Sequence, residues 1–259
     1  MKEIILPIWN ITLHINPIAF HLFGVPIYWY AIFIVASLGL AMFAYYKNDK
    51  KFGIHFDDII DLSLILIPVS FISARIYYVL FNLQSYTSIS QMLNLKDGGL
   101  AIYGGIIGGA ITAYIFCKKR NISFLNLADY IIPYVSLGQA IGRWGNFVNA
   151  EAYGAVTNLP WKMGIHTPEG LQYVHPTFLY ESIADFFIFL LLIKLSKNRK
   201  YEGQILLTYV IAYSFIRFFI EGLRADSLML GPFRISQIVS GILFIIAIFC
   251  IIGLKRKQK

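Results

Sequence analysis

Seven apolar runs divide the chain, and together they limit it to a fold within a membrane. They cover residues 28–46, 59–81, 100–117, 124–141, 176–195, 204–220 and 235–254. Each run approaches the length of about 20 helical residues that crosses a hydrocarbon core about 30 Å thick. Only 14% of the 259 residues are charged, whereas soluble domains carry about 25%. The sequence therefore predicts an all-α membrane protein with seven transmembrane helices.

The basic residues lie in alternate connections between these runs. Of the 22 Lys and Arg residues, 14 follow the first, third, fifth or seventh run. Because cytoplasmic loops of membrane proteins carry an excess of Lys and Arg, we expect these connections and the C-terminus in the cytoplasm and the N-terminus outside. The net charge of +8 then reflects topology, so we expect no nucleic-acid partner.

No internal repeat or low-complexity linker separates the runs, so residues 1–259 are expected to form one membrane domain. The long outer connection at about 142–175 is expected to form a cap, and residues 155–174 show no pattern that predicts a fold. Pro7 and Asn10 interrupt the apolar N-terminus, which makes a removed signal peptide unexpected. Cys117 and Cys250 lack ligand-like spacing, so we expect no metal, disulfide or cofactor.

A polar stretch, residues 142–154, follows the fourth apolar run directly. It contains Arg143, Asn146, Asn149, Glu151 and Gly154. Charges at membrane depth are costly and mark functional sites by default, although an arginine that reaches up to the interface from a polar loop is the simpler alternative. A guanidinium stays charged and offers a planar fork of donors that matches phosphate oxygens. The stretch therefore indicates an anion site around Arg143.

A second charged group lies in the sixth run. Tyr213, Arg217 and Glu221 recur every four residues and so share one helix face, and Arg224 follows. An internal Arg217–Glu221 pair that lets the helix insert is one interpretation. A second buried arginine on the same side as Arg143 favours the other, an anionic ligand shared by both. Glu181, one turn into the fifth run, is expected to pair with an arginine because an unpaired buried carboxylate is costly.

The second and third runs also carry polar or small residues at their outer ends. Arg75 lies near the end of the second run, and Tyr103 precedes glycines with a small-xxx-small spacing, Gly104 to Gly108. Such glycines allow close approach of a neighbouring helix or of a lipid headgroup. Tyr103 suits a hydrogen bond to a headgroup or, equally, a place in the interfacial aromatic belt.

Together these segments resemble the bacterial prolipoprotein diacylglyceryl transferase family over nearly the full chain. The resemblance rests on residues 28–30, 74–76, 97–99 with 103–105, 142–154, 175–177 and 217–224. It implies a multi-pass enzyme of the bacterial cell membrane with its active site on the extracytoplasmic side. Such enzymes move the diacylglyceryl group of phosphatidylglycerol onto the lipobox cysteine of a prolipoprotein and release glycerol phosphate, the first step of lipoprotein maturation.

The resemblance also implies roles for the residues singled out above. Many family members carry a histidine with a proton-accepting role where this chain has Tyr103. A phenol is a poor base at neutral pH, so either Tyr103 only donates a hydrogen bond, or Glu151 or the departing phosphate takes the thiol proton. We expect Arg143 and Arg217 to bind the phosphate, Glu151 to orient Arg143, and Asn146 and Tyr30 to act as neutral donors. The remaining residues expected to bind substrate are Arg75, Gly104, Gly154, Tyr213, Glu221 and Arg224.

The expected partners are phosphatidylglycerol, prolipoprotein signal peptides with a lipobox cysteine, and membrane lipids, with the protein acting as a monomer. The nucleophile comes from the substrate thiol, which requires no cysteine of the enzyme. A transporter for an anionic lipid is a rival function because it would also use buried arginines. Transporters commonly show internal repeats and midplane sites, and the sequence shows neither.

Overall fold

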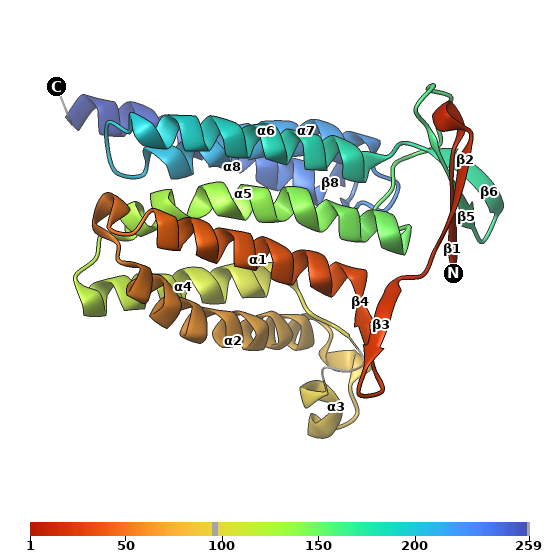
Figure 1. Ribbon diagram of the computed structural model, residues 1–259, viewed down its shortest axis with the longest axis horizontal. Helices are drawn as coiled ribbons and strands as arrows, with labels where there is room; N and C mark the ends of the chain where they lie inside the picture. The colour runs from red at the N-terminus through yellow and green to blue at the C-terminus, as the bar shows by residue number, and fades with distance from the viewer. Residues whose placement is uncertain (95–97, 258–259) are drawn as a thin grey trace. The chain divides into compact units, whose positions relative to one another are not determined.

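The computed structural model describes residues 1–94 and 98–257, and its long helices coincide with the seven apolar runs (Figure 1). In this part of the chain the long helices are α1 (Trp29–Lys47), α2 (Phe56–Phe81), α4 (Ile102–Arg120), α5 (Phe124–Asn149), α6 (Thr177–Lys197), α7 (Gln204–Leu223) and α8 (Ile235–Lys257). The short α3 (Ile89–Leu93) and the 3-10 turns Pro7–Trp9, Lys51–Gly53 and Leu83–Ser85 lie in connections. The prediction of a helix at each apolar run is confirmed.

Four of the described helices are long and apolar enough to cross a membrane: α1, α2, α7 and, over Ile235–Gly253, α8. The protein is therefore a mostly helical membrane protein. The other long helices, α4, α5 and α6, are more polar because they contain charged residues. Helix α4 ends in three basic residues, whereas α5 contains Asp129 and Arg143 and α6 contains Glu181 and Asp185. The residues that lower their hydropathy include those expected to form the site.

The chain divides into two compact units, which are described separately. The first comprises Met1–Ala44 and Ile131–Lys259, and the second comprises Tyr45–Tyr130. In the second unit α2 packs along α4. A Cβ added at Gly104 would lie 2.5 Å from the carbonyl oxygen of Ser73, and one at Gly108 would collide with the Ser73 side chain. The glycines at this spacing therefore serve close helix packing.

The first unit contains a β-sheet, so the prediction of an all-α fold is wrong. Strands β1 (Lys2–Leu6), β2 (Ile11–Ile15), β5 (Met163–Thr167) and β6 (Gly170–Val174) form an antiparallel sheet in the order β2-β1-β5-β6. In register, Ile4 of β1 faces Leu13 of β2 and Ile165 of β5. The sheet lies at the end of the helices where α5 ends and α6 begins (Figure 1). Its strands are only five residues long, and β1 pairs with a segment near residue 164, which no local pattern indicates.

The sheet covers an apolar core that joins it to the helices. Ile4, Met163, Ile165, Val174 and Phe178 are buried together, and Phe178 belongs to the first turn of α6. The two short hairpins of this unit are β3 (Ile18–Leu22) with β4 (Val25–Tyr28), and β7 (Met229–Leu230) with β8 (Phe233–Arg234). The segment 155–174, for which the sequence predicted no fold, thus contributes two strands to the sheet.

Helix α5 also extends further than expected. The apolar run ends at residue 141, but the helix continues to Asn149, so Arg143 and Asn146 lie on its last turns. The glycines and polar residues of this stretch have the composition of a loop. They are nevertheless helical because α5 packs here against other parts of its unit, as the contacts at Gly145 below show. The predicted outer connection therefore begins after Asn149.

Candidate active site

One carboxylate joins two arginines from separate helices. Glu181, one turn into α6, forms an ion pair through Oε2 with Nη2 of Arg143 on α5. Through Oε1 it forms an ion pair with Nη1 of Arg217 on α7. The Glu181 side chain is only 5% exposed, whereas those of Arg143 and Arg217 are 20% and 16% exposed. The structure thus brings the two predicted phosphate ligands together and confirms that Glu181 pairs with an arginine.

Two further acidic residues and a third arginine complete this group. Arg217 also pairs with Glu221 one turn later in α7, at 2.5 Å from Nη2 to Oε2, which is the internal pair that the sequence left as the alternative interpretation. Nη1 of Arg224 lies 3.9 Å from Oε1 of Glu181. Arg224 also binds Asp226 through Nε at 2.9 Å and Nη2 at 2.8 Å. We call Arg143, Arg217, Arg224, Glu181, Glu221 and Asp226 the arginine cluster.

Pairing with Arg224 shifts the pKa of the Asp226 carboxyl group. Burial acts to raise the pKa of this carboxyl, but the hydrogen bond and the positive charge of Arg224 outweigh that effect and lower the pKa below its ordinary value. Asp226 therefore stays ionised and fixes the Arg224 guanidinium next to Glu181.

The turn that carries Arg224 is held by Arg234, which the sequence analysis did not identify. Nη1 of Arg234 donates to the carbonyl oxygens of Glu221 and Arg224, the latter at 2.7 Å, and to Oγ of Ser227 at 2.9 Å. Arg234 directly precedes α8, so it ties the end of α7 to the start of α8. In the sequence, Arg234 stands beside Phe233 and directly before an apolar run, and this position gives little indication of its role.

Glu151 contacts asparagines instead of the arginine it was expected to orient. Its Oε1 accepts hydrogen bonds from Nδ2 of Asn146 at 2.9 Å and from Nδ2 of Asn149 at 3.2 Å. Asn146 in turn accepts from Nη1 of Arg143 at 3.5 Å. The carboxylate that pairs with Arg143 is Glu181, which lies on the facing helix. Glu151 thus acts on Arg143 only through Asn146.

Two glycines bring the backbone of this stretch against neighbouring elements. A Cβ at Gly145 would collide with the ring of Tyr30, which places Tyr30 of α1 against α5 one residue from Asn146. A Cβ at Gly154 would lie 2.6 Å from Cβ of His175 and 2.8 Å from the carbonyl oxygen of Leu223. The Gly154 amide donates to the His175 carbonyl at 2.9 Å. Gly154 thereby joins the end of α7 to the chain that enters α6.

A buried polar group lies one turn further into the helices than the arginine cluster. Asp185, four residues after Glu181, is 1% exposed. Its electrostatic neighbours are Arg143, Arg217 and Glu181, together with Tyr209 and Tyr213 of α7. Tyr213 stacks on Tyr209 with 5.5 Å between ring centroids. Asp185 was not among the residues predicted from the sequence, although its spacing of four from Glu181 places both on one helix face.

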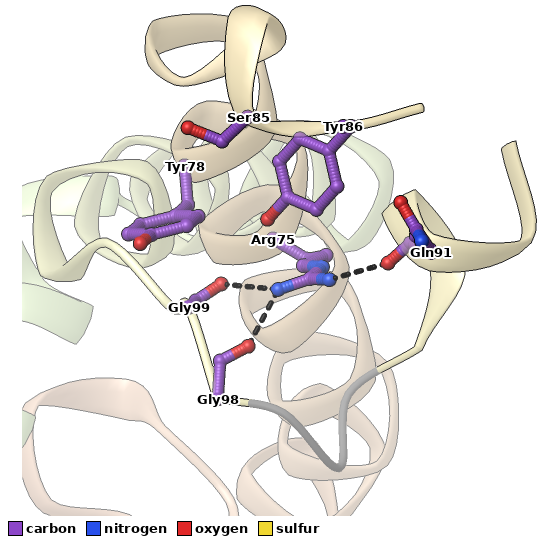
Figure 2. A pocket seen from close by; sticks show the side chains of 7 residues that line it. All are labelled: Arg75, Tyr78, Ser85, Tyr86, Gln91, Gly98 and Gly99. Atoms are coloured by element: carbon purple, nitrogen blue, oxygen red, sulfur yellow. Dashed lines mark hydrogen bonds between the residues drawn. The ribbon is translucent and has the colours of Figure 1, made fainter. Parts of the chain in front are cut away.

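Three predicted site residues belong to the second unit, where Arg75 has a structural role. Its guanidinium donates hydrogen bonds of 2.5–3.0 Å to five backbone carbonyls, those of Gln91, Met92, Asn94, Gly98 and Gly99. Figure 2 shows Arg75 reaching from α2 to both glycines and to Gln91, beside the ring of Tyr86. A guanidinium has five N–H groups, so its donors are fully used. Arg75 therefore ties the end of α3 and the two glycines that precede α4 to helix α2.

The other two residues of this unit lie at the start of α4. Tyr103 is 42% exposed, whereas Gly104 is buried against α2, as described above. Beside Arg75 is a cavity of about 270 Å³ lined by Tyr78, Ser85, Tyr86, Gln91, Gly98 and Gly99 (Figure 2). The packing role of Gly104 accounts for its small size without a headgroup contact.

The chain is similar in sequence to known proteins over nearly its whole length. Residues 17–253 match the family model described as prolipoprotein diacylglyceryl transferase. A protein of Clostridioides difficile (strain 630), named phosphatidylglycerol–prolipoprotein diacylglyceryl transferase, is 51% identical over 243 residues, which is 93% of this chain and 96% of that protein. Proteins with the same name from Finegoldia magna and Bacillus mycoides are 46% and 44% identical, over 93% and 94% of this chain and 96% and 94% of their own lengths. The chain therefore belongs to the prolipoprotein diacylglyceryl transferase family.

Proposed function

We propose that this protein transfers the diacylglyceryl group of phosphatidylglycerol to the thiol of the lipobox cysteine of prolipoproteins, forming a thioether and releasing glycerol phosphate. The relatives at 44–51% identity that carry the matching name support this reaction. The observation that carries it is the convergence of Arg143 and Arg217 on one anion. A lipid phosphate presents oxygens to the same two guanidinium groups.

The proposed setting is the bacterial cell membrane, which the chain crosses seven times as a monomer, with its N-terminus outside and its C-terminus in the cytoplasm. The distribution of charge supports this topology. In the first unit α6 begins near the arginine cluster and ends at Lys194 and Lys197. Basic residues favour the cytoplasmic side, so the arginine cluster would face outward. Signal peptides of exported prolipoproteins are accessible from that side.

In the proposed reaction the thiol sulfur attacks the glycerol carbon that carries the phosphate ester. The sulfur–carbon bond forms while the carbon–oxygen bond breaks, and the electron pair stays on the phosphate oxygen. Arg143 and Arg217 stabilise this growing charge, with Asn146 and Tyr30 as neutral donors, and such fixed donors are each worth on the order of 100-fold in rate. The thiol proton leaves to Glu151 or to the departing phosphate.

The remaining residues support this core. Glu221 holds the Arg217 guanidinium, and Arg224 adds a positive charge beside Glu181. Tyr213 lies on the same face of α7, and Gly154 permits the close approach of α7. Tyr103 donates a hydrogen bond to the lipid headgroup. Arg75 contributes indirectly by holding the loop before α4.

The test is direct. Purified protein is incubated with phosphatidylglycerol and a synthetic lipobox peptide, and the peptide mass is measured. We expect a gain of one diacylglyceryl unit at the cysteine with wild-type protein and none with a peptide that carries serine at that position. An unchanged peptide in the presence of folded protein and lipid would contradict the proposal. Movement of lipid between leaflets without a mass change would favour a transporter.

A further inference from the structure

Glu181 binds one Nη of each arginine and so lies where a phosphate that bridges the two guanidinium groups would lie. Arg143 and Arg217 each direct one Nη to this carboxylate, and the second Nη of Arg217 is taken by Glu221. Carboxylate and phosphate oxygens both accept paired hydrogen bonds from a guanidinium group. A phosphate that enters between the two arginines must therefore compete with Glu181 for them.

The charges of the arginine cluster make this competition unfavourable unless a further change accompanies it. Its three guanidinium groups already face three carboxylates within the described residues. A phosphate adds another negative charge, and the buried carboxyl group of Asp185 lies one turn further along α6. The titratable and charged groups that face Glu181 are Arg143 from α5, Asp185 from its own helix, Tyr213, Arg217 and Glu221 from α7, and Arg224 after it.

A Glu181 carboxylate that has lost its arginines would be a buried anion beside Asp185. Buried charges without a partner are strongly unfavourable, and two neighbouring carboxyls resist being ionised together. Uptake of one proton by Glu181 neutralises the excess negative charge, so that the positive and negative charges of the arginine cluster are again equal in number.

We propose that Glu181 is an exchangeable counter-ion. It holds Arg143 and Arg217 in place while no phosphate is bound, yields them to the phosphate group of the substrate, and takes up a proton in the exchange. When glycerol phosphate leaves, the carboxylate loses that proton and pairs with the arginines again. Glu181 is thus a positioning residue that also assists product release. This inference rests on the proposed function and describes how phosphate binding at the same site is regulated.

The experiment measures binding and proton uptake together. Glycerol 1-phosphate is titrated into the purified protein in phosphatidylcholine nanodiscs by calorimetry, in two buffers with different heats of ionisation. For wild-type protein we expect uptake of about one proton per bound ligand. For Glu181→Gln we expect binding roughly tenfold tighter, because the competing charge is gone, and no proton uptake. Glu169→Gln removes an exposed carboxylate on the β5–β6 hairpin and should match wild type.

Parallel titrations with inorganic phosphate, and kinetics with phosphatidylglycerol, distinguish a site for free phosphate from a site for the phosphate of the lipid. We expect Glu181→Gln to lower both KM for phosphatidylglycerol and kcat, because substrate and product are both held more tightly. Tighter binding of inorganic phosphate alone would overturn the inference, since it would reveal only a general anion site. Wild-type binding without proton uptake would also overturn it, and this result does not depend on whether the variant folds.

These outcomes are distinct from failure of the proposed function. Wild-type protein that lipidates the peptide but shows no proton uptake refutes the counter-ion exchange and leaves the transferase function standing. Proton-coupled binding of glycerol phosphate by a protein that leaves the peptide unmodified supports the exchange and refutes the transferase function.

Discussion

Arg143 and Arg217 bind opposite oxygens of one carboxylate, that of Glu181, although they belong to different helices. The arrangement fixes two guanidinium groups toward a common point, which is the geometry required to hold one phosphate from two sides. With Glu221 and Asp226 counted as well, the three arginines of the cluster already face three carboxylates before any substrate arrives. Both properties give rise to testable expectations.

The first prediction concerns Arg143. Arg143→Ala should lower the rate of lipid transfer by about 100-fold or more, because a donor fixed toward the developing phosphate charge is lost. The peptide mass assay measures the rate, and the amount of protein in the membrane serves as the folding control. Arg143→Lys should also fail to restore full activity, since an ammonium lacks the planar fork. Activity within a few-fold of wild type for Arg143→Ala would exclude this residue from the reaction.

The second prediction compares two glycines of α5. Gly145→Ala should impair activity because its methyl group would collide with the Tyr30 ring and displace the helix near Asn146. Gly142→Ala is the matched control, since a Cβ there meets no atom within 4 Å and the position is helical. The control should keep its activity and gain up to about 1 kcal/mol in helix stability. Equal effects of both substitutions would indicate a general requirement for helix flexibility.

The third prediction separates structure from substrate binding at Arg75. Arg75→Lys should lower the thermal stability and expose the backbone at Asn94 and at Gly98 to proteolysis, because an ammonium cannot satisfy five carbonyls in the places the guanidinium reaches. Hydrogen bonds to a charged donor contribute roughly 1.5–3 kcal/mol each, so the loss should be large. A variant of normal stability with a raised KM for phosphatidylglycerol would instead identify Arg75 as a lipid ligand.

The fourth prediction addresses the Tyr103 hydroxyl. Tyr103→Phe should reduce the transfer rate by roughly tenfold, about the value of one hydrogen bond, while the exposed ring position keeps the fold intact. Tyr103→His should retain activity, since imidazole also donates a hydrogen bond. The transfer rate of each variant is compared at equal protein concentration. Full activity of Tyr103→Phe would remove the hydroxyl from the mechanism.

The positions of the helices were predicted correctly because each apolar run has to be buried, either in a membrane or in a protein core. The sequence also predicted the pairing of Glu181, since a buried carboxylate requires a cation. It assigned the wrong carboxylate to Arg143, because Glu151 is close in sequence whereas Glu181 becomes a neighbour only when α5 and α6 pack together.

Other features had no local signature. The partners of Arg75 are backbone carbonyls, which any residue can supply, so nothing in the sequence distinguished a structural guanidinium from a phosphate ligand. The sheet depends on β1 meeting β5 from far along the chain, and its strands are too short for a period of two to stand out. The helical end of α5 was hidden by Gly142 and Gly145, of which Gly145 packs closely against Tyr30.

The most direct test is the position of the lipid phosphate in a structure determined with bound phosphatidylglycerol. The account predicts that the phosphate lies between Arg143 and Arg217, with hydrogen bonds to both, and that Glu181 no longer bridges them. A phosphate bound away from both arginines, with Glu181 still joining them, would contradict it.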